Sequence, residues 1–120
     1  MKYLCLIYDA ESVLAAMPKA EMEHFLGEYT AFGKEHRAQG TVLGGNRLRP
    51  VQDATTVRIR NGKVSATDGP FAETKEQLGG YFLVEARDLN EAIQIASRIP
   101  SARTGSIEVR PIWEMAAPPA

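Results

Sequence analysis

The sequence predicts an α+β domain built from two strand–helix–strand halves with a β-hairpin inserted between them. Two apolar stretches, residues 2–8 and 79–87, each begin one half, and each is followed by a segment with helical spacing of apolar residues. Asn61-Gly62 marks a tight turn between the halves. This order predicts a ferredoxin-like split βαβ fold with an inserted hairpin, in which both helices cover one face of an antiparallel sheet.

The first half is predicted to contain a strand, a long helix and a second strand. Residues 2–8 carry bulky apolar side chains at odd and even positions, which indicates a strand covered on both faces. Pro18 suits the first turn of a helix, and apolar residues then recur every three or four positions until Gly40, a residue type that commonly ends helices. Residues 41–48, interrupted by two glycines, are predicted to form a short strand.

The inserted hairpin is predicted from its turn. Residues 54–60 and 63–66 flank Asn61-Gly62, and both positions of such a two-residue turn require positive φ. A loop over residues 67–78 then leads into the second half.

The second half repeats the strand–helix–strand order. After strand 79–87, Asp88 opens a capping box, and Pro100 closes the helix that follows. Residues 107–114 form the last predicted strand, where Pro111 indicates an edge position or a bulge. The residues expected on the buried face of this helix are Leu89, Ala92, Ile93 and Ala96.

Strands that are apolar on both faces need cover that the two helices do not supply. If the helices lie on one side of the sheet, the apolar residues of 2–8 and 79–87 on the other side stay bare. The simplest cover is the same face of a second copy. We therefore expect a two-fold homodimer through the sheet face, forming a dimeric α/β barrel.

Composition narrows the class of protein. The chain has 120 residues, 14 Lys+Arg against 15 Asp+Glu, and a net charge of -1, which fits one domain over residues 1–115 with a flexible tail at 116–120. A near-neutral charge argues against binding to nucleic acid or to an anionic membrane. The apolar run from Tyr3 to Tyr8 is too short for a signal peptide or a membrane span. The single Cys5 favours a reducing compartment, so we expect a cytoplasmic protein.

The sequence offers little to a metal or an organic cofactor. No cysteine set for zinc and no phosphate-binding glycine loop occurs. Glu21, His24 and Glu28 share one helical face at metal-like spacing, but the spacing occurs once, and a solvated polar face is the preferred interpretation. We expect neither a metal nor a cofactor.

Asp68, Glu73 and Lys75 are the candidate catalytic residues. They lie in the loop that follows the hairpin, where Asp68-Gly69-Pro70 is typical of a tight turn. Such a turn does not require the charges that follow it. A carboxylate beside a cation offers an acid or base whose pKa is shifted. The alternatives are a turn-capping role for Asp68 and a surface ion pair for Lys75.

Candidate substrate-binding residues are two arginines and three tyrosines. Arg58 on the hairpin and Arg110 beside Pro111 are candidate contacts for an anion, against an exposed strand position and an ion pair as the alternatives. The tyrosines are candidates to line a pocket for an aromatic molecule, against core or dimer packing: Tyr8, Tyr29 and Tyr81.

The stretch from Asp68 to Tyr81, DGPFAETKEQLGGY, resembles the signature of the DGPF-domain family, a branch of the YCII-related proteins. The resemblance continues in residues 2–8, 54–58, 88–96 and 107–111. It implies a dimeric α/β barrel of ferredoxin-like subunits, similar to muconolactone isomerase. It implies no settled reaction: some members of the wider group resemble dehydrochlorinases of chlorinated aromatics, and others are encoded beside extracytoplasmic-function sigma factors.

One departure from the family affects the site. YCII proteins carry a histidine on the first helix that is proposed to pair with an aspartate as a catalytic dyad. Counted back from Gly40, the comparable position here holds Tyr29, while His24 and His36 lie elsewhere on the helix. The dyad is therefore not carried over to this chain.

Two functions are predicted on these grounds. The first is a cofactor-independent lyase or isomerase acting on a small aromatic or anionic molecule, with Asp68 as acid or base and Lys75 or Arg58 contacting the anion. The second is a non-catalytic ligand-binding or regulatory module, with a sigma factor as its partner. An Asp68 side chain that is exposed and remote from any cavity would count against the first.

Overall fold

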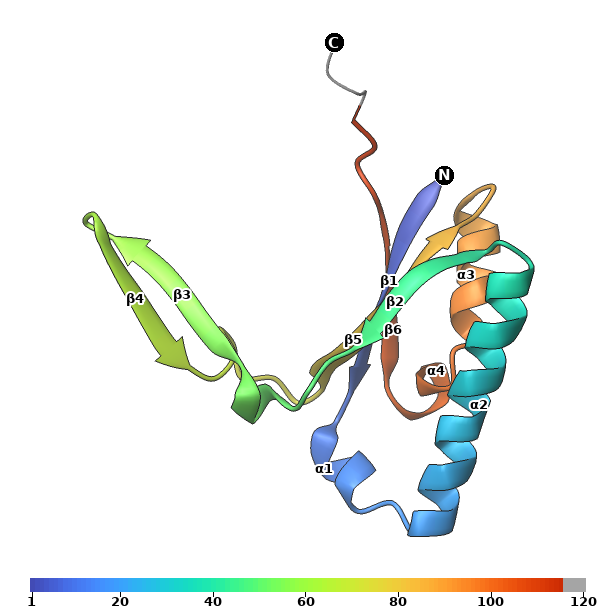
Figure 1. Cartoon of the computed structure of the whole chain (residues 1–120), viewed down its shortest axis with the longest axis horizontal. Helices are drawn as coiled ribbons and strands as arrows, with labels where there is room; N and C mark the ends of the chain where they lie inside the picture. Colours follow the sequence, from blue (N-terminus) through green and yellow to red (C-terminus); the bar gives the residue numbers. More distant parts are fainter. Residues whose placement is uncertain (116–120) are drawn as a thin grey trace.

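A four-stranded antiparallel sheet forms the body of the protein in the computed structural model, which describes residues 1–115 (Figure 1). The flexible tail predicted at 116–120 lies outside the described residues. The strand order is β2-β5-β1-β6, which is compatible with the predicted ferredoxin-like plan. The strands are β1 (Lys2–Asp9), β2 (Val42–Arg47), β5 (Gln77–Glu85) and β6 (Ser106–Pro111).

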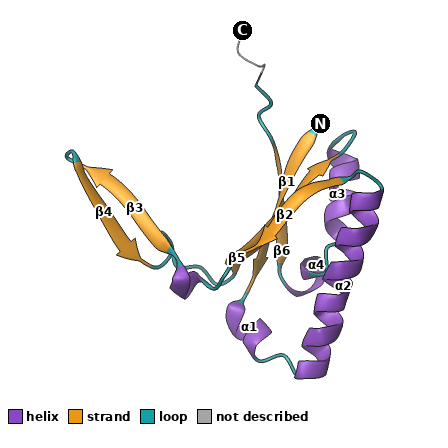
Figure 2. Ribbon diagram, in the orientation of Figure 1, coloured by secondary structure: helices purple, strands orange, loops and turns teal. Residues whose placement is uncertain are grey.

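Two helices, α2 (Lys19–Ala38) and α3 (Leu89–Ser97), lie on one side of the sheet (Figure 2). The capping box of α3 is confirmed, since the Asp88 carboxylate accepts a hydrogen bond of 2.9 Å from the backbone N–H of Glu91. The longest described helix, α2, carries too many charges to cross a membrane, and no other helix in residues 1–115 is long enough. Three short helical turns were not predicted: α1 (Glu11–Ala15), η1 (Val51–Asp53) and α4 (Ser101–Thr104).

The core lies between the sheet and the two helices. Alternate residues of β1 face it, and Tyr3, Cys5 and Ile7 are buried there together with Phe32 from α2 and Phe82 from β5. No helix of residues 1–115 covers the opposite face of β1 and β5. The apolar side chains on it are partly exposed in the single chain: Leu4, Leu6, Tyr8, Leu78, Tyr81 and Leu83.

The predicted buried face of α3 is wrong in part. Leu89 and Ile93 are 50% and 48% exposed, whereas Ala92, Ile95 and Ala96 are buried. The buried residues recur at helical spacing, from Ala92 to Ile95 and from Ala96 to Ile99. The helix is therefore rotated about its axis relative to the prediction. The predicted buried face begins at Leu89, but this residue lies in the first turn of the helix and its side chain is half exposed to solvent.

The inserted hairpin stands clear of the body (Figure 1). Its strands are β3 (Thr55–Arg60) and β4 (Lys63–Asp68), and we call residues 55–68 the arm. Asn61 and Gly62 have φ of 54° and 74°, which confirms the two-residue turn. The arm forms a two-stranded sheet of its own, separate from the body sheet.

The burial of Cys5 gives a chemical test of the core. Cys5 is fully buried, and burial raises the pKa of its thiol to about 11. Because the thiolate is the reactive form, we expect the folded protein at pH 8 to react with Ellman's reagent at least about 100-fold more slowly than the protein unfolded in urea. Labelling of the native protein at the unfolded rate would contradict this packing.

Candidate functional site

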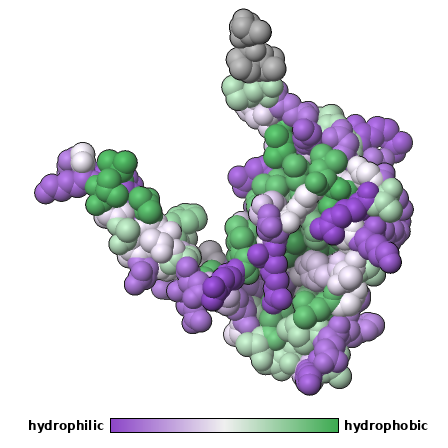
Figure 3. All heavy atoms as spheres, viewed as in Figure 1, coloured by the Kyte–Doolittle hydropathy of each residue, from purple (hydrophilic) through white to green (hydrophobic). Residues whose placement is uncertain are grey.

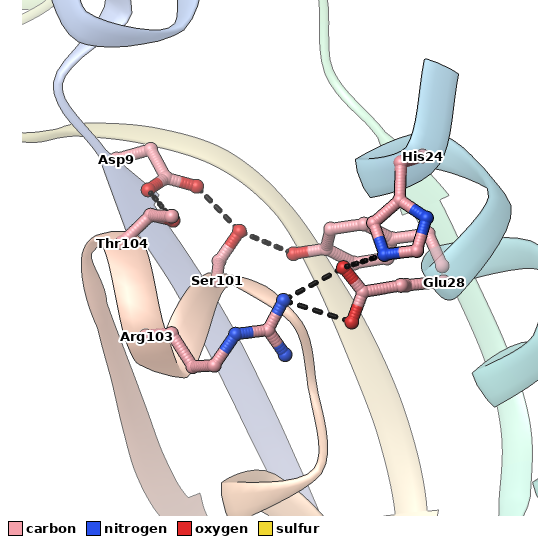
Figure 4. Close-up of polar contacts among 7 residues, drawn as sticks. Asp9, His24, Glu28, Ser101, Arg103 and Thr104 are labelled. Carbon is pink, nitrogen blue, oxygen red and sulfur yellow. Dashed lines mark hydrogen bonds and ion pairs between the residues drawn. The ribbon is translucent and has the colours of Figure 1, made fainter. Parts of the chain in front are cut away.

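The last residue of β1 is a buried acid. Asp9 is only 7% exposed and faces the helices, on the same side of the sheet as Ile7. Two hydroxyl groups donate hydrogen bonds to its carboxylate: Ser101 to Oδ2, and Thr104 to Oδ1 at 2.7 Å (Figure 4). Burial of a carboxylate is costly unless hydrogen bonds compensate, so these donors fix α4 against the end of β1.

Tyr29 extends this arrangement to the long helix. Its hydroxyl donates a hydrogen bond of 2.5 Å to Ser101 Oγ, so Tyr29, Ser101 and Asp9 form a continuous chain. The Tyr29 ring meets Phe25 edge-on, with centroids 5.4 Å apart, and stacks near Phe82 at 6.4 Å. These contacts hold the hydroxyl over the end of the sheet.

The pKa of Tyr29 lies above its usual value, so the phenol is protonated at neutral pH. Burial raises the pKa of the phenol above its usual value, the Ser101 hydrogen bond and the positive charge of Arg47 lower it, and Asp9 raises it. Ser101 has one hydroxyl proton, which it gives to Asp9, so it accepts from Tyr29. The lone pairs of the Tyr29 oxygen remain able to accept a proton from a bound molecule.

Two glycines allow the backbone to approach this site. A Cβ on Gly105 would lie 2.0 Å from the carbonyl oxygen of Tyr8 and 2.6 Å from Asp9 Oδ1. Gly80 pairs with Ile7 on one side and with Arg47 on the other, and a Cβ there would lie 2.8 Å from the Asn46 carbonyl oxygen. Arg47 thus lies at the site end of β2, in register with a residue that has no side chain.

An open depression of about 300 Å³ borders the chain of hydroxyls. Thr104, which bonds Asp9, and Phe25, which contacts Tyr29, both line it. Arg103 donates to both carboxylate oxygens of Glu28 at 2.7 and 2.8 Å. The remaining lining residues are Met17, Glu21 and His24.

The spacing of Glu21, His24 and Glu28 does not produce a metal site. His24 Nε2 lies 3.7 Å from Glu28, which is engaged with Arg103 (Figure 4). Within residues 1–115, no group of three or more His, Cys, Asp or Glu side chains is arranged to hold a metal ion.

Asp68, Glu73 and Lys75 are exposed, and none lines this depression or a second one of about 230 Å³ beside His36 and Arg98. Gly69, at φ 100°, turns the chain there, and its N–H donates to the Ala54 carbonyl at 2.7 Å. The Asp-Gly-Pro segment therefore closes the base of the arm. In the single chain this exposure counts against an acid or base enclosed in a cavity.

The other predicted site residues are dispersed. Tyr8 and Tyr81 lie on the open face of the sheet, where Tyr81 accepts a hydrogen bond of 2.8 Å from Asn46. Arg110 forms an ion pair with Glu108. Arg58 is exposed on the arm opposite Ser65. Of the eight candidates, the structure joins only Tyr29 to a buried polar group.

Asp9, Ser101 and Arg47 are not among the site residues predicted from the sequence. Asp9 had a usable signal, because it continues the alternation of Tyr3, Cys5 and Ile7 and so places an acid on the buried side of the strand. Ser101 had none, since α4 is a single turn after Pro100, where the helix was expected to have ended.

Comparison with known proteins shows which family the sequence resembles. The profile of the YCII-related domain matches residues 1–116. An uncharacterized protein of Rhizobium meliloti (strain 1021) is 40% identical over 114 residues, which cover 93% of this chain and 92% of that protein. Neither match assigns a reaction or a partner.

The hydroxyl chain can be tested by its contribution to stability. Ser101→Ala removes a donor from a buried carboxylate and should lower the free energy of unfolding by about 2–3 kcal/mol, whereas Tyr29→Phe removes one outer hydrogen bond and should cost about 1 kcal/mol. Urea unfolding followed by circular dichroism measures both. Equal losses in the two variants would show that Asp9 does not depend on Ser101.

Proposed function

This chain belongs to the YCII-related family, and we propose that it catalyses a cofactor-independent proton transfer, of the isomerase or lyase type, on a small anionic molecule. The observation that carries the proposal is the chain of hydrogen bonds from Tyr29 through Ser101 to the buried Asp9. Buried, hydrogen-bonded titratable groups of this kind concentrate at functional sites.

The hydrogen bonds from Tyr29 through Ser101 to Asp9 provide a path along which one proton can be transferred. A carbon acid gives its proton to the Tyr29 oxygen, Tyr29 passes its own proton to Ser101, and Ser101 passes its proton to Asp9. No phenolate accumulates, which suits a phenol whose pKa is raised by burial. Return of the proton to a different carbon completes an isomerisation. Departure of a leaving group from the carbanion, followed by release of the Asp9 proton to water, completes an elimination.

One cation near the hydrogen-bonded residues, Arg47, favours an anionic molecule. Arg47 lies at the end of β2 opposite Gly80, and its positive charge lowers the pKa of Tyr29. No residue in the range 1–115 forms an ion pair with Arg47. The ring of Phe25 supplies an apolar wall at the depression. We assign substrate binding to Arg47 and proton transfer to Tyr29, Ser101 and Asp9.

The resemblance to YCII proteins supports the placement. Those proteins carry a helix histidine that is proposed to pair with an aspartate, and Tyr29 holds the comparable position here. Tyr29 reaches an aspartate through the Ser101 hydroxyl, so a tyrosine, a serine and an aspartate would take the place of the pair.

We also propose that the protein works as a homodimer through the open face of its sheet. Six partly exposed apolar side chains on that face support this proposal, since such a patch is costly to leave in water. Asp68, Glu73 and Lys75 stay in the proposal as charges of the loop that leads to the site, because this loop ends at Gln77, which pairs with Asp9.

The alternative is a ligand-binding or regulatory module without chemistry, with a sigma factor among its candidate partners. The exposure of Asp68, Glu73 and Lys75 favours it, since exposed charges on a loop suit contact with another molecule. Under this alternative, a bound molecule stabilises the protein without exchanging its carbon-bound protons.

A solvent-exchange experiment distinguishes these functions. Small carboxylic acids, with and without aromatic rings, are first screened by thermal shift. Stabilising compounds are then incubated with the protein in D₂O, and loss of carbon-bound protons is followed by NMR. We expect exchange with the wild type, a decrease of about 10²- to 10⁴-fold in Tyr29→Phe with binding retained, and weaker binding in Arg47→Gln.

The two carboxylates provide the internal comparison. Asp9→Asn should abolish exchange, and Asp68→Asn should leave it within about threefold of the wild type. Loss of exchange in Asp68→Asn alone would return the acid–base role to the loop. Binding without exchange in the wild type would favour the regulatory alternative.

A further inference from the structure

The arm carries an apolar face that its own body does not cover. Its register pairs Val57 with Ala66 and Ile59 with Val64, so these four side chains share one face. Val57, Ile59 and Val64 are 62%, 63% and 70% exposed. Figure 3 shows apolar atoms along the arm, well apart from the body. A patch of this kind on a projecting element marks an interaction site.

The opposite face of the arm and its tip are basic. Arg58, Arg60 and Lys63 make no ion pair with any residue in the described range 1–115. The arm holds these three cations against the single acid Asp68, while the chain as a whole has a net charge of -1. The rest of the molecule is therefore net acidic, and the arm and the body of this one sequence are electrostatically complementary.

The base of the arm is tied to the body so that it points outward. The Glu11 carboxylate accepts a hydrogen bond of 2.9 Å from the Val51 N–H, and the Gln77 side-chain oxygen accepts one of 2.8 Å from the Glu11 N–H. These bonds join α1 to both connections of the arm. A two-stranded hairpin without packing is at best marginally stable in water, so the arm needs a surface other than its own body.

We propose that the arm packs its apolar face on a second copy of this chain, with the arm of each copy reaching over the body of the other. β2 and β5, which form part of the open sheet face, lead directly into the two connections of the arm (Figure 1). A copy seated on that face lies within reach of the arm, and its net acidic body meets the basic tip. The inference rests on the sheet-face homodimer and adds a second, reciprocal contact to it.

The proposal is tested by charges placed on either face of the arm. Ile59→Lys with Val64→Lys places two lysines on the apolar face, and Ser65→Lys with Thr67→Lys places two on the opposite face as the matched control. All four positions are exposed, so both proteins should keep the wild-type circular dichroism spectrum. Sedimentation equilibrium should show a dimer dissociation constant raised by about 100-fold or more in the first protein and within about threefold of wild type in the control.

A cross-linking experiment reports the contact directly and does not depend on those variants. Lys63→Cys places a thiol at the arm tip, while buried Cys5 stays unreactive. A photoreactive label is attached there, and ¹⁵N and ¹⁴N proteins are unfolded and refolded together. We expect cross-linked peptide pairs with one heavy and one light member, joining the tip to the partner's body.

The outcomes separate this inference from the proposed function. Cross-links confined to peptides of one isotope, or equal dimer affinity in both pairs of variants, would overturn the role of the arm. In that case Leu6→Lys, on the open sheet face, should still dissociate the dimer. A wild type that sediments as a monomer at micromolar concentration would overturn the arm contact and the sheet-face dimer together, while the solvent-exchange result for Tyr29 would stand.

Discussion

The buried carboxylate of Asp9 is the constraint around which this end of the molecule is organised. A carboxylate that is 7% exposed needs donors, and here they come from Ser101 and Thr104, more than ninety residues later in the chain. Those two residues lie on a single helical turn, α4, which their hydrogen bonds fix against the end of β1. Tyr29 then joins the long helix to the same point, and Gly105 lets the backbone pass close enough for the contacts to form.

The structure places the buried carboxylate, Asp9, and the Asp68 turn in two different regions, whereas the sequence predicts an acid only at Asp68. The loop around Asp68 is the catalytic site that the sequence predicts, because an acid and a cation follow a rigid turn. In the structure that turn closes the base of the arm, with Gly69 at φ 100° and its N–H bonded to Ala54. The buried carboxylate of Asp9 lies elsewhere, at the end of β1, where Ser101 connects it to Tyr29 of α2. Gln77 links the two regions by pairing with Asp9 at the end of the sheet. One end of the molecule therefore holds both the enclosed polar chain and the root of the projecting arm.

Much of the fold could be predicted because its signals are local. The Asn61-Gly62 turn, the cap at Asp88 and the strand pattern of β1 each depend on a few neighbouring residues, and the structure contains all three. The rotation of α3 could not be predicted from the sequence. Ile93 and Ile95 are the same residue type, and only packing of the helix against the sheet determines that Ile95 is buried and Ile93 exposed. Ser101 could not be found either, because its role comes from contacts with Asp9 and Tyr29, which are distant in the sequence. Among the residues of the candidate site, Tyr29 is the one that the sequence predicted.

The direct test of this account is the state of the hydroxyl protons in the chain from Tyr29 to Asp9. Proton NMR of the folded protein should show two slowly exchanging, downfield hydroxyl resonances, one lost in Tyr29→Phe and both changed in Ser101→Ala. A nuclear Overhauser contact should connect them. A Tyr29 hydroxyl proton that exchanges with water as fast as that of free tyrosine, with no contact to Ser101, would contradict the hydrogen-bond chain on which the proposed chemistry depends.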